Sequence, residues 1–128
     1  MKKPVLSMLL ALFLLLTGCG AGNGAAYEQI DARTAHTMME EQPEAVILDV
    51  REQDEYDGGH IPGAVLLPLG TIDEDRARAV IPAKDTTVLV YCRSGNRSKQ
   101  AAGKLADLGY TAVYEFGGIK DWSYEIET

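Results

Sequence analysis

Short apolar runs alternate with polar segments of helical length from Tyr27 to the C-terminus. Most of the runs are rich in β-branched or aromatic residues and are bounded by Gly, Pro or Asp, a pattern typical of strands. We predict strands at Tyr27–Ile30, Ala45–Val50, Ala64–Leu67, Val88–Tyr91 and Thr111–Tyr114. The Ala45–Val50 run is continuous, which indicates a strand that is covered on both faces.

The polar segments carry the start and stop signals of helices. Asp31 can cap the first helix, and Gly109 can end the fourth. We predict helices at Ala32–Glu41, Arg51–Tyr56, Thr71–Ile81, Lys99–Leu108 and Ile119–Glu125, of which the second is a short helical turn. Strands that alternate with helices imply an α/β fold with a mainly parallel sheet.

The N-terminus has the pattern of an export signal. Lys2 and Lys3 precede the apolar run Val5–Leu16, which is too short to span a bilayer as a stable helix. The segment Leu16-Thr17-Gly18-Cys19 follows and resembles a bacterial lipobox. We therefore expect residues 1–18 to be removed as a signal peptide and Cys19 to carry lipid. The alternative is an ordinary secretory signal that is cleaved near Ala21 or Ala25.

Residues 19–26 are rich in Gly and Ala and predict a flexible tether, followed by a single domain at residues 27–128. The expected location is the bacterial cell envelope, with a membrane contact through the lipid. Gly20 is not the Asp that lipoproteins associate with retention in the inner membrane. This favours the periplasmic face of the outer membrane if the cell has two membranes, and the outer face of the cell membrane if it has one.

The charge of the chain excludes some classes of partner. It has 12 basic and 19 acidic residues, and the loss of Lys2 and Lys3 with the signal would leave 10 against 19, a formal charge of −9. Such an acidic domain is a poor binder of nucleic acid or anionic lipid. Arg93 and Arg97 form a local positive site with Lys99, which argues for a small anion as the ligand. Lys104 is assigned to the solvated face of a helix.

The candidate nucleophile is Cys92, which follows the strand Val88–Tyr91. A loop then leads to Ser98, which can cap the next helix, and a loop before a helix N-terminus binds anions through its N–H groups and the helix dipole. Flanking arginines favour the thiolate form of a cysteine. The alternative, a small buried apolar cysteine, does not explain two arginines within five residues of the thiol.

Cysteine usage supports a chemical role for this thiol. If Cys19 is lipidated, Cys92 has no disulfide partner in an exported protein, where a free thiol is exposed to oxidation. The sequence has neither a CxxC pair nor a Cys/His cluster at the spacing of metal ligands. We predict no metal and no cofactor.

Several motifs together resemble a single-domain rhodanese, of the small exported envelope-stress type. The resemblance covers about residues 28–126. Its motifs are Leu48-Asp49-Val50-Arg51-Glu52, Glu55-Tyr56, Gly59-His60-Ile61-Pro62-Gly63-Ala64, Cys92-Arg93-Ser94-Gly95-Asn96-Arg97-Ser98, Gly117-Gly118-Ile119 and Trp122.

The resemblance implies a three-layer fold with a five-stranded parallel sheet and helices on both faces. It also implies a sulfurtransferase in which Cys92 takes sulfane sulfur from a small anionic donor such as thiosulfate. The resulting persulfide would pass its outer sulfur to cyanide or to a thiol. We expect the donor to be bound by the residues that follow the cysteine: Arg93, Ser94, Gly95, Asn96, Arg97 and Ser98. We expect a monomer.

Three further residues receive supporting roles. Asp49 and Arg51 match family residues near the site, and Asp49 is interpreted as a buried acid that holds an arginine or the active loop. For Arg51, substrate contact and ion pairing both stay open. His60 lies in a predicted turn, and we assign it a structural role because a thiolate nucleophile needs no general base.

Other functions remain as alternatives. A phosphatase or arsenate reductase also uses a cysteine loop that ends in arginine, but with five intervening residues, whereas Cys92 and Arg97 are separated by four. Rhodanese-like domains that sense or bind without catalysis lack the cysteine. A persulfide carrier that serves a partner protein would share the first half-reaction with the enzyme.

Overall fold

Five parallel strands form the centre of the protein in the computed structural model, which describes residues 26–128. They occur in the order β1-β5-β4-β2-β3, and every neighbouring pair is parallel. The strands are β1 Glu28–Gln29, β2 Val46–Asp49, β3 Val65–Leu66, β4 Val88–Cys92 and β5 Val113–Gly118. The sheet order places β4 between β2 and β5, so the end of β4 has neighbours on both sides.

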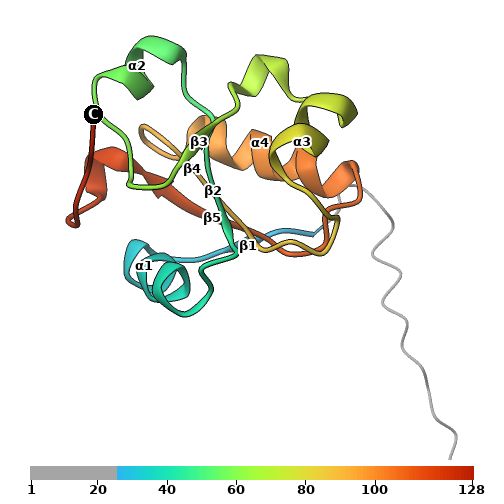
Figure 1. Cartoon of the computed structure of the whole chain (residues 1–128), viewed down its shortest axis with the longest axis horizontal. Coiled ribbons are helices and arrows are strands. Elements are labelled where there is room, and N and C mark those ends of the chain that lie inside the picture. The colour runs from blue at the N-terminus through green and yellow to red at the C-terminus, as the bar shows by residue number, and fades with distance from the viewer. Residues whose placement is uncertain (1–25) are drawn as a thin grey trace, which may run out of the picture.

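Helices cover both faces of the sheet, with α1 on the face opposite α3 and α4 (Figure 1). The helices are α1 Ala32–Glu41, α2 Gln53–Asp57, α3 Glu74–Val80 and α4 Asn96–Asp107, with 3₁₀ turns at Leu69–Thr71 and Ile119–Asp121. Asp31 caps α1 by accepting a hydrogen bond from Thr34 N–H at 2.7 Å. This confirms the expected cap and the three-layer α/β fold.

The strand β4 is buried along its whole length because it lies between the two layers of helices. Val88, Val90 and Cys92 point into the core shared with α3 and α4. Leu89 and Tyr91 point into the second core, which includes Ala35 of α1. Because side chains alternate along a strand, β4 contributes residues to two separate cores.

The sequence misplaces several element boundaries. The helix expected at Thr71–Ile81 begins at Glu74, with Asp73 as its N-cap, and the strand expected at Thr111–Tyr114 is Val113–Gly118. The helix expected at Lys99–Leu108 begins three residues earlier, at Asn96, with Gly95 as its N-cap. The helix expected at Ile119–Glu125 is only the 3₁₀ turn at Ile119–Asp121, and an isolated bridge between His60 and Glu127 ties the chain beyond it to the 60s loop. Two main-chain hydrogen bonds of 2.8 Å form this bridge, and tertiary pairing of this kind overrides weak helical propensity.

The predictions for the N-terminus concern residues that are not described. The signal peptide at 1–18, the lipid on Cys19 and nearly all of the tether at 19–26 lie outside residues 26–128. Within the described part of the chain, none of the helices has the length and apolar character needed to cross a bilayer.

Candidate active site

The last residue of β4 is Cys92, and only residues 93–95 separate it from α4. Gly95 adopts φ +103°, a left-handed conformation that favours glycine, and this lets the chain turn from the strand into the helix within a short distance. Cys92 thus lies at the carboxyl edge of the sheet and at the N-terminus of α4. The expected juxtaposition of strand, loop and helix is present, but Arg97 and Ser98 belong to the first turn of the helix and Ser98 is not its cap.

The thiol of Cys92 is almost completely buried, with 1% of the residue exposed. Gly95 N–H donates a hydrogen bond of 3.0 Å to its sulfur, and the Ser98 hydroxyl oxygen lies 3.4 Å from the same atom. Burial raises the pKa of Cys92, but its hydrogen bonds with the Ser98 side chain and with the N–H groups of Ser94, Gly95 and Ser98 outweigh that effect. The pKa of the thiol is therefore below its ordinary value.

The source of this lowering differs from the expectation. The sequence suggested that two arginines hold the sulfur as a thiolate, but uncharged donors lower the pKa of Cys92 more than either guanidinium does. The donors lie at hydrogen-bond distance in a site without bulk water, where their dipoles act strongly. Arg93, in contrast, is exposed, and Arg97 is occupied by an acid from another element.

A buried acid that sequence reasoning missed holds Ser98. The Ser98 hydroxyl donates to Glu115 Oε2 at 2.6 Å, and the same oxygen accepts from Gly117 N–H at 2.7 Å. Glu115 lies on β5 with only 3% of its surface exposed. It connects the strand beside β4 to the hydroxyl that contacts Cys92, so we assign it a positioning role. The only signal in the sequence was an acid directly after the predicted strand Thr111–Tyr114.

Close approach of two backbones also defines the site. Gly118 of β5 lies opposite Cys92 in the parallel ladder, and a Cβ atom at this glycine would overlap the carbonyl group of Arg93. The same carbonyl accepts a hydrogen bond of 3.2 Å from Lys120 N–H. The sequence marked Gly117-Gly118 as a family motif but did not indicate that Gly118 contacts the active loop.

Arg97 forms a two-pronged ion pair. Its Nη1 and Nη2 atoms donate to the two carboxylate oxygens of Glu55 at 2.7 and 2.8 Å. Glu55 belongs to α2, which follows β2, so its contact with Arg97 depends on β2 and β4 being adjacent in the sheet. Of the other predicted substrate-binding residues, Arg93, Ser94 and Asn96 are exposed beside the loop, while Gly95 is buried.

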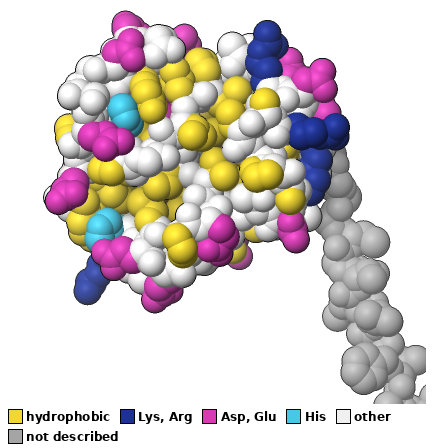
Figure 2. All heavy atoms as spheres, viewed as in Figure 1, with side chains coloured by type: hydrophobic (Ala, Val, Ile, Leu, Met, Phe, Trp, Pro, Cys, Tyr) yellow, Lys and Arg dark blue, Asp and Glu magenta, His cyan; other side chains and the backbone are white. Residues whose placement is uncertain are grey.

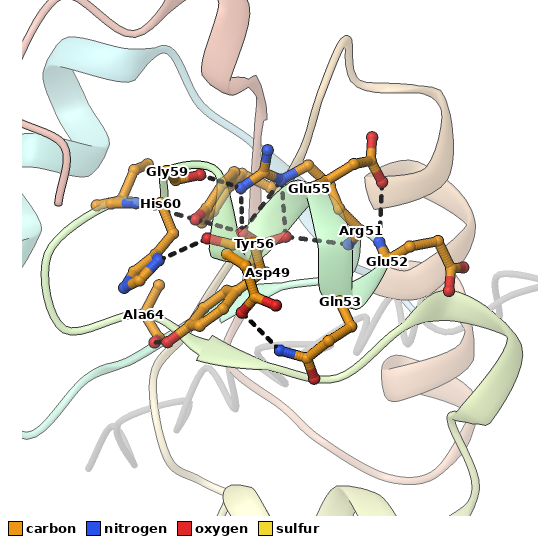
Figure 3. A network of polar contacts seen from close by, with 12 residues as sticks. Asp49, Arg51, Glu52, Gln53, Glu55, Tyr56, Gly59, His60 and Ala64 are labelled. Atoms are coloured by element: carbon orange, nitrogen blue, oxygen red, sulfur yellow. Dashed lines mark hydrogen bonds and ion pairs between the residues drawn. The ribbon is translucent and has the colours of Figure 1, made fainter. Parts of the chain in front are cut away.

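The predicted supporting pair is a buried ion pair next to the site (Figure 3). Arg51 donates to Asp49 through Nε and Nη2, the latter at 2.7 Å, and Nη2 also donates to the carbonyl oxygen of Gly59 at 2.7 Å. The Tyr91 hydroxyl donates to Asp49 at 2.6 Å and accepts from Ile61 N–H at 3.1 Å. Asp49 therefore joins β2, β4 and the loop at residues 59–61. Tyr91, which sequence reasoning assigned only to a strand, completes this network.

His60 is buried beside this network. Its ring stacks on Tyr56 with a centroid distance of 3.8 Å, and its Nδ1 lies 2.9 Å from the carbonyl oxygen of Tyr56. Its Nε2 lies 3.4 Å from a carboxylate oxygen of Glu127. These contacts are with structural neighbours and agree with the structural role expected for His60.

A hollow of about 730 Å³ in the described part of the chain does not include the cysteine loop. It lies between α1, the residues that follow His60 and the C-terminal segment, and Figure 2 shows a face on which apolar, acidic and histidine side chains lie together. Its lining has Trp122 and Tyr124 but no cysteine. The nucleophile identifies the site more reliably than the size of the hollow does. Across residues 26–128 there is also no cluster of His, Cys, Asp and Glu able to hold a metal ion.

This arrangement suits chemistry at sulfur. A thiolate surrounded by N–H groups at a helix N-terminus can attack an electrophilic sulfur, and the same donors can stabilise negative charge on an atom added to it. The loop has only four residues between Cys92 and Arg97, a length that suits one additional atom better than an entire tetrahedral oxyanion.

Comparison with known proteins supports this interpretation. The family model for the rhodanese-like domain matches residues 31–125. The thiosulfate sulfurtransferase PspE of Escherichia coli is 45% identical over 74 residues, which are 58% of this chain and 70% of PspE. The thiosulfate sulfurtransferase GlpE of Coxiella burnetii is 35% identical over 97 residues, covering 75% of this chain and 87% of GlpE.

A solved structure has the same fold. The structure described as rhodanese with anions from E. coli superposes with a TM-score of 0.61 at 36% sequence identity, covering 66% of this chain and 98% of that one. The matched region of the family model includes every site residue described above, from Asp49 to Gly118.

Proposed function

The chain belongs to the family of rhodanese-like domains, and on that premise we propose that it is a sulfurtransferase that works through a persulfide on Cys92. The single observation that carries the proposal is the Cys92 sulfur itself, which is buried at a helix N-terminus, receives a hydrogen bond from Gly95 N–H and contacts the Ser98 hydroxyl oxygen. Relatives named as thiosulfate sulfurtransferases support the class of reaction.

In the first half-reaction the Cys92 thiolate attacks the outer sulfur of thiosulfate. A new sulfur–sulfur bond forms on Cys92, the sulfur–sulfur bond of the donor breaks, and its electron pair leaves with sulfite. The persulfide keeps one negative charge, which the N–H groups of the loop stabilise in the way an oxyanion hole stabilises developing charge. Gly95 N–H, at 3.0 Å from the thiol sulfur, is the best placed of these donors.

In the second half-reaction an acceptor attacks the outer sulfur of the persulfide. Cyanide would leave as thiocyanate, and a thiolate would leave as a new persulfide; both restore the Cys92 thiolate. The sulfur that moves is the outermost atom of the site, so the acceptor needs to reach only the mouth of the loop, where Arg93, Ser94 and Asn96 are exposed.

The mass of the intact protein tests the proposal. The full chain, reduced and kept in a mild nonionic detergent, is weighed before thiosulfate, after thiosulfate and after cyanide. We expect a gain of one sulfur, about 32 Da, that is absent in Cys92→Ser and that cyanide discharges as thiocyanate. A folded, reduced protein that gains no mass from thiosulfate would contradict the proposal.

The same experiment separates an enzyme from a carrier. If the persulfide forms quickly but is discharged slowly by cyanide and by every small thiol tested, the chain is a carrier for a partner protein. Turnover with a small acceptor supports the enzyme.

We also propose that the chain is a lipoprotein of the bacterial cell envelope, with its lipid on Cys19. The support is the sequence alone: a basic start, the apolar run Val5–Leu16 and the lipobox-like Leu16–Cys19. Labelling cells with a radioactive fatty acid should mark the wild-type chain but not Cys19→Ser, and should place the wild type in the membrane fraction. An unlabelled wild-type chain in the soluble fraction would overturn this proposal.

A further inference from the structure

The acid that binds Arg97 changes the charge that the active site presents. Arg97 follows Cys92 by five residues and is the only cation in the first turn of α4 that forms an ion pair in the described chain. Both of its terminal nitrogens are taken by Glu55, at 2.7 and 2.8 Å. This pair occupies the end of the guanidinium formed by Nη1 and Nη2, so Arg97 cannot offer that face to an anionic substrate while Glu55 holds it, and the carboxylate offsets its charge.

The pair has good geometry, and Glu55 is ionised under ordinary conditions. The side chains are 31% and 27% exposed, so solvent screens it only in part. Hydrogen bonds from Arg97 lower the pKa of Glu55 to about 2, and the carboxylate therefore stays ionised at every working pH. Glu55 has a third contact: its Oε2 also accepts a hydrogen bond of 2.8 Å from Glu52 N–H, which helps to fix the carboxylate.

Arg97 nevertheless acts on the nucleophile. Glu55 is the main reason that the pKa of Arg97 is raised, and the Cys92 sulfur contributes to the same rise. The guanidinium and the thiolate thus interact electrostatically. The negative charge of Glu55 offsets that of Arg97 and therefore reduces the positive potential at the place where a donor approaches Cys92.

The remaining cation of the loop is Arg93. It is exposed, and nothing in residues 26–128 forms an ion pair or a hydrogen bond with its guanidinium. The segment from Cys92 to Ser98 carries two positive side chains, and Glu55 offsets one of them. One unpaired positive charge suits a donor with one negative charge better than a donor with two.

We propose that Glu55 determines the charge of the sulfur donor, so that the site favours singly charged sulfane donors, such as thiosulfonates and persulfides, over the thiosulfate dianion. This inference rests on the proposed sulfurtransferase function and specifies its substrate class. Glu55 acts through Arg97 and touches neither the donor nor the sulfur, so it is a positioning residue.

Two donors isolate the effect of charge. Methanethiosulfonate and thiosulfate both present a sulfane sulfur on a tetrahedral sulfur, but the first carries one negative charge and the second two. With either donor the Cys92 thiolate bonds to the sulfane sulfur and the donor's sulfur–sulfur bond breaks. The leaving group takes the electron pair, as methanesulfinate in one case and sulfite in the other, and Cys92 persulfide is the common product.

The experiment compares kcat/KM for the two donors with the full chain in detergent and cyanide as acceptor. Glu55→Gln keeps an oxygen that can accept from Glu52 N–H but removes the charge. We expect it to raise the ratio of thiosulfate to methanethiosulfonate by about fivefold to tenfold at low ionic strength, and by less at high salt. The matched control is Asp54→Asn, which removes the same charge from the neighbouring exposed position of α2 and should leave the ratio unchanged.

A double-mutant cycle and a titration of Cys92 test whether Glu55 acts by offsetting the charge of Arg97. Arg97→Met alone should lower the ratio below that of the wild type, because it leaves the negative charge of Glu55 uncompensated, and adding Glu55→Gln should bring the ratio back to about the wild-type value. Glu55→Gln alone should also shift the pH profile of Cys92 alkylation to lower pH, since the released guanidinium favours the thiolate. A role of Glu55 limited to holding α2 would move neither readout.

The outcomes are distinct. A ratio that is unchanged in Glu55→Gln, that changes equally in Asp54→Asn, or that does not return toward the wild-type value in the double variant overturns the inference while the sulfurtransferase proposal stands. Failure of both donors to add sulfur to Cys92 in the wild type overturns the proposed function itself.

Discussion

At the scale of single residues, the reactivity of Cys92 depends on neutral hydrogen-bond donors. The Ser98 side chain and the N–H groups of Ser94, Gly95 and Ser98 oppose the effect of burial on the pKa of the thiol. The Ser98 hydroxyl itself donates to Glu115, so the oxygen that contacts the sulfur has a fixed position. Preorganised dipoles of this kind stabilise charge without having to reorient during the reaction.

Replacing Ser98 tests this view of the thiol. Ser98→Ala should raise the pKa of Cys92, because it removes a hydrogen bond that favours the thiolate, and should slow alkylation by iodoacetamide at pH 7 by about threefold or more. Ser94→Ala is the control, since its hydroxyl is exposed and has no partner within residues 26–128. Equal alkylation rates in the wild type and Ser98→Ala would exclude this role of the hydroxyl.

A second residue-scale prediction concerns Gly118. Gly118→Ala should lower the free energy of unfolding by about 2–3 kcal/mol, because its methyl group overlaps the Arg93 carbonyl and must displace the active loop. Gly103→Ala is the matched control: no atom lies within 4 Å of its added methyl group, and removing a helical glycine should stabilise the protein by about 0.5–1 kcal/mol. Urea denaturation followed by circular dichroism measures both, and equal stabilities would contradict the overlap.

At the scale of elements, the sheet order brings the functional groups together. Cys92 ends β4, Glu115 and Gly118 come from β5 on one side, and Asp49 comes from β2 on the other. The carboxyl ends of these parallel strands meet at one edge, which is where ligands bind in folds of this type. The helix α2, which directly follows β2, adds Glu55 to the same edge.

Tyr91 should be important for the connection between these elements. Tyr91→Phe removes a hydroxyl that donates to buried Asp49 and accepts from Ile61 N–H, and leaving these groups without that partner should lower the free energy of unfolding by about 1–3 kcal/mol. Tyr114→Phe is the control, because its hydroxyl forms no hydrogen bond with the described residues. Thermal and urea unfolding would show the difference, and a Tyr91→Phe protein as stable as Tyr114→Phe would disprove it.

At the scale of the whole molecule, an acidic protein depends on the few cations that balance its carboxylates. Arg51 and Arg97 each pair with an acid from the same edge of the sheet. The Glu55–Arg97 pair joins segments that are 42 residues apart in the sequence, and the Asp49–Arg51 pair is buried. The excess of acidic residues elsewhere disfavours anionic macromolecules, while the loop around Cys92 still presents Arg93 to a small anion.

The Glu55–Arg97 pair should make stability depend on pH in the acid range. The pKa of Glu55 is lowered from 4.5 to about 2 in the folded protein, so its contribution is present above pH 4.5 and is lost as the pH falls toward 2. Allowing for solvent screening, we expect about 1–2 kcal/mol of the acid-induced loss to disappear in Glu55→Gln but not in Asp54→Asn. Urea denaturation between pH 7 and pH 2.5 measures it, and parallel curves for the wild type and Glu55→Gln would refute it.

The sequence by itself determined the features that depend on neighbouring residues. The runs of apolar residues, the cap at Asp31 and the turn after Cys92 follow local preferences of the backbone and the side chains. They were enough to predict the α/β class, the nucleophile and the edge of the sheet at which it lies. The resemblance of the motifs to rhodanese then indicated the family, which the match over residues 31–125 confirms.

Only the tertiary structure decided which distant residues act on Cys92. Glu55 is 42 residues from Arg97 in the sequence, and Glu115 is 17 from Ser98, yet both form contacts shorter than 3 Å. Hydrogen bonds and partly buried ion pairs act over a few ångströms, so their partners are selected by the β5-β4-β2 order of the strands and not by spacing along the chain. For this reason the sequence predicted two free arginines beside the thiol, whereas the fold leaves only Arg93 unpaired there.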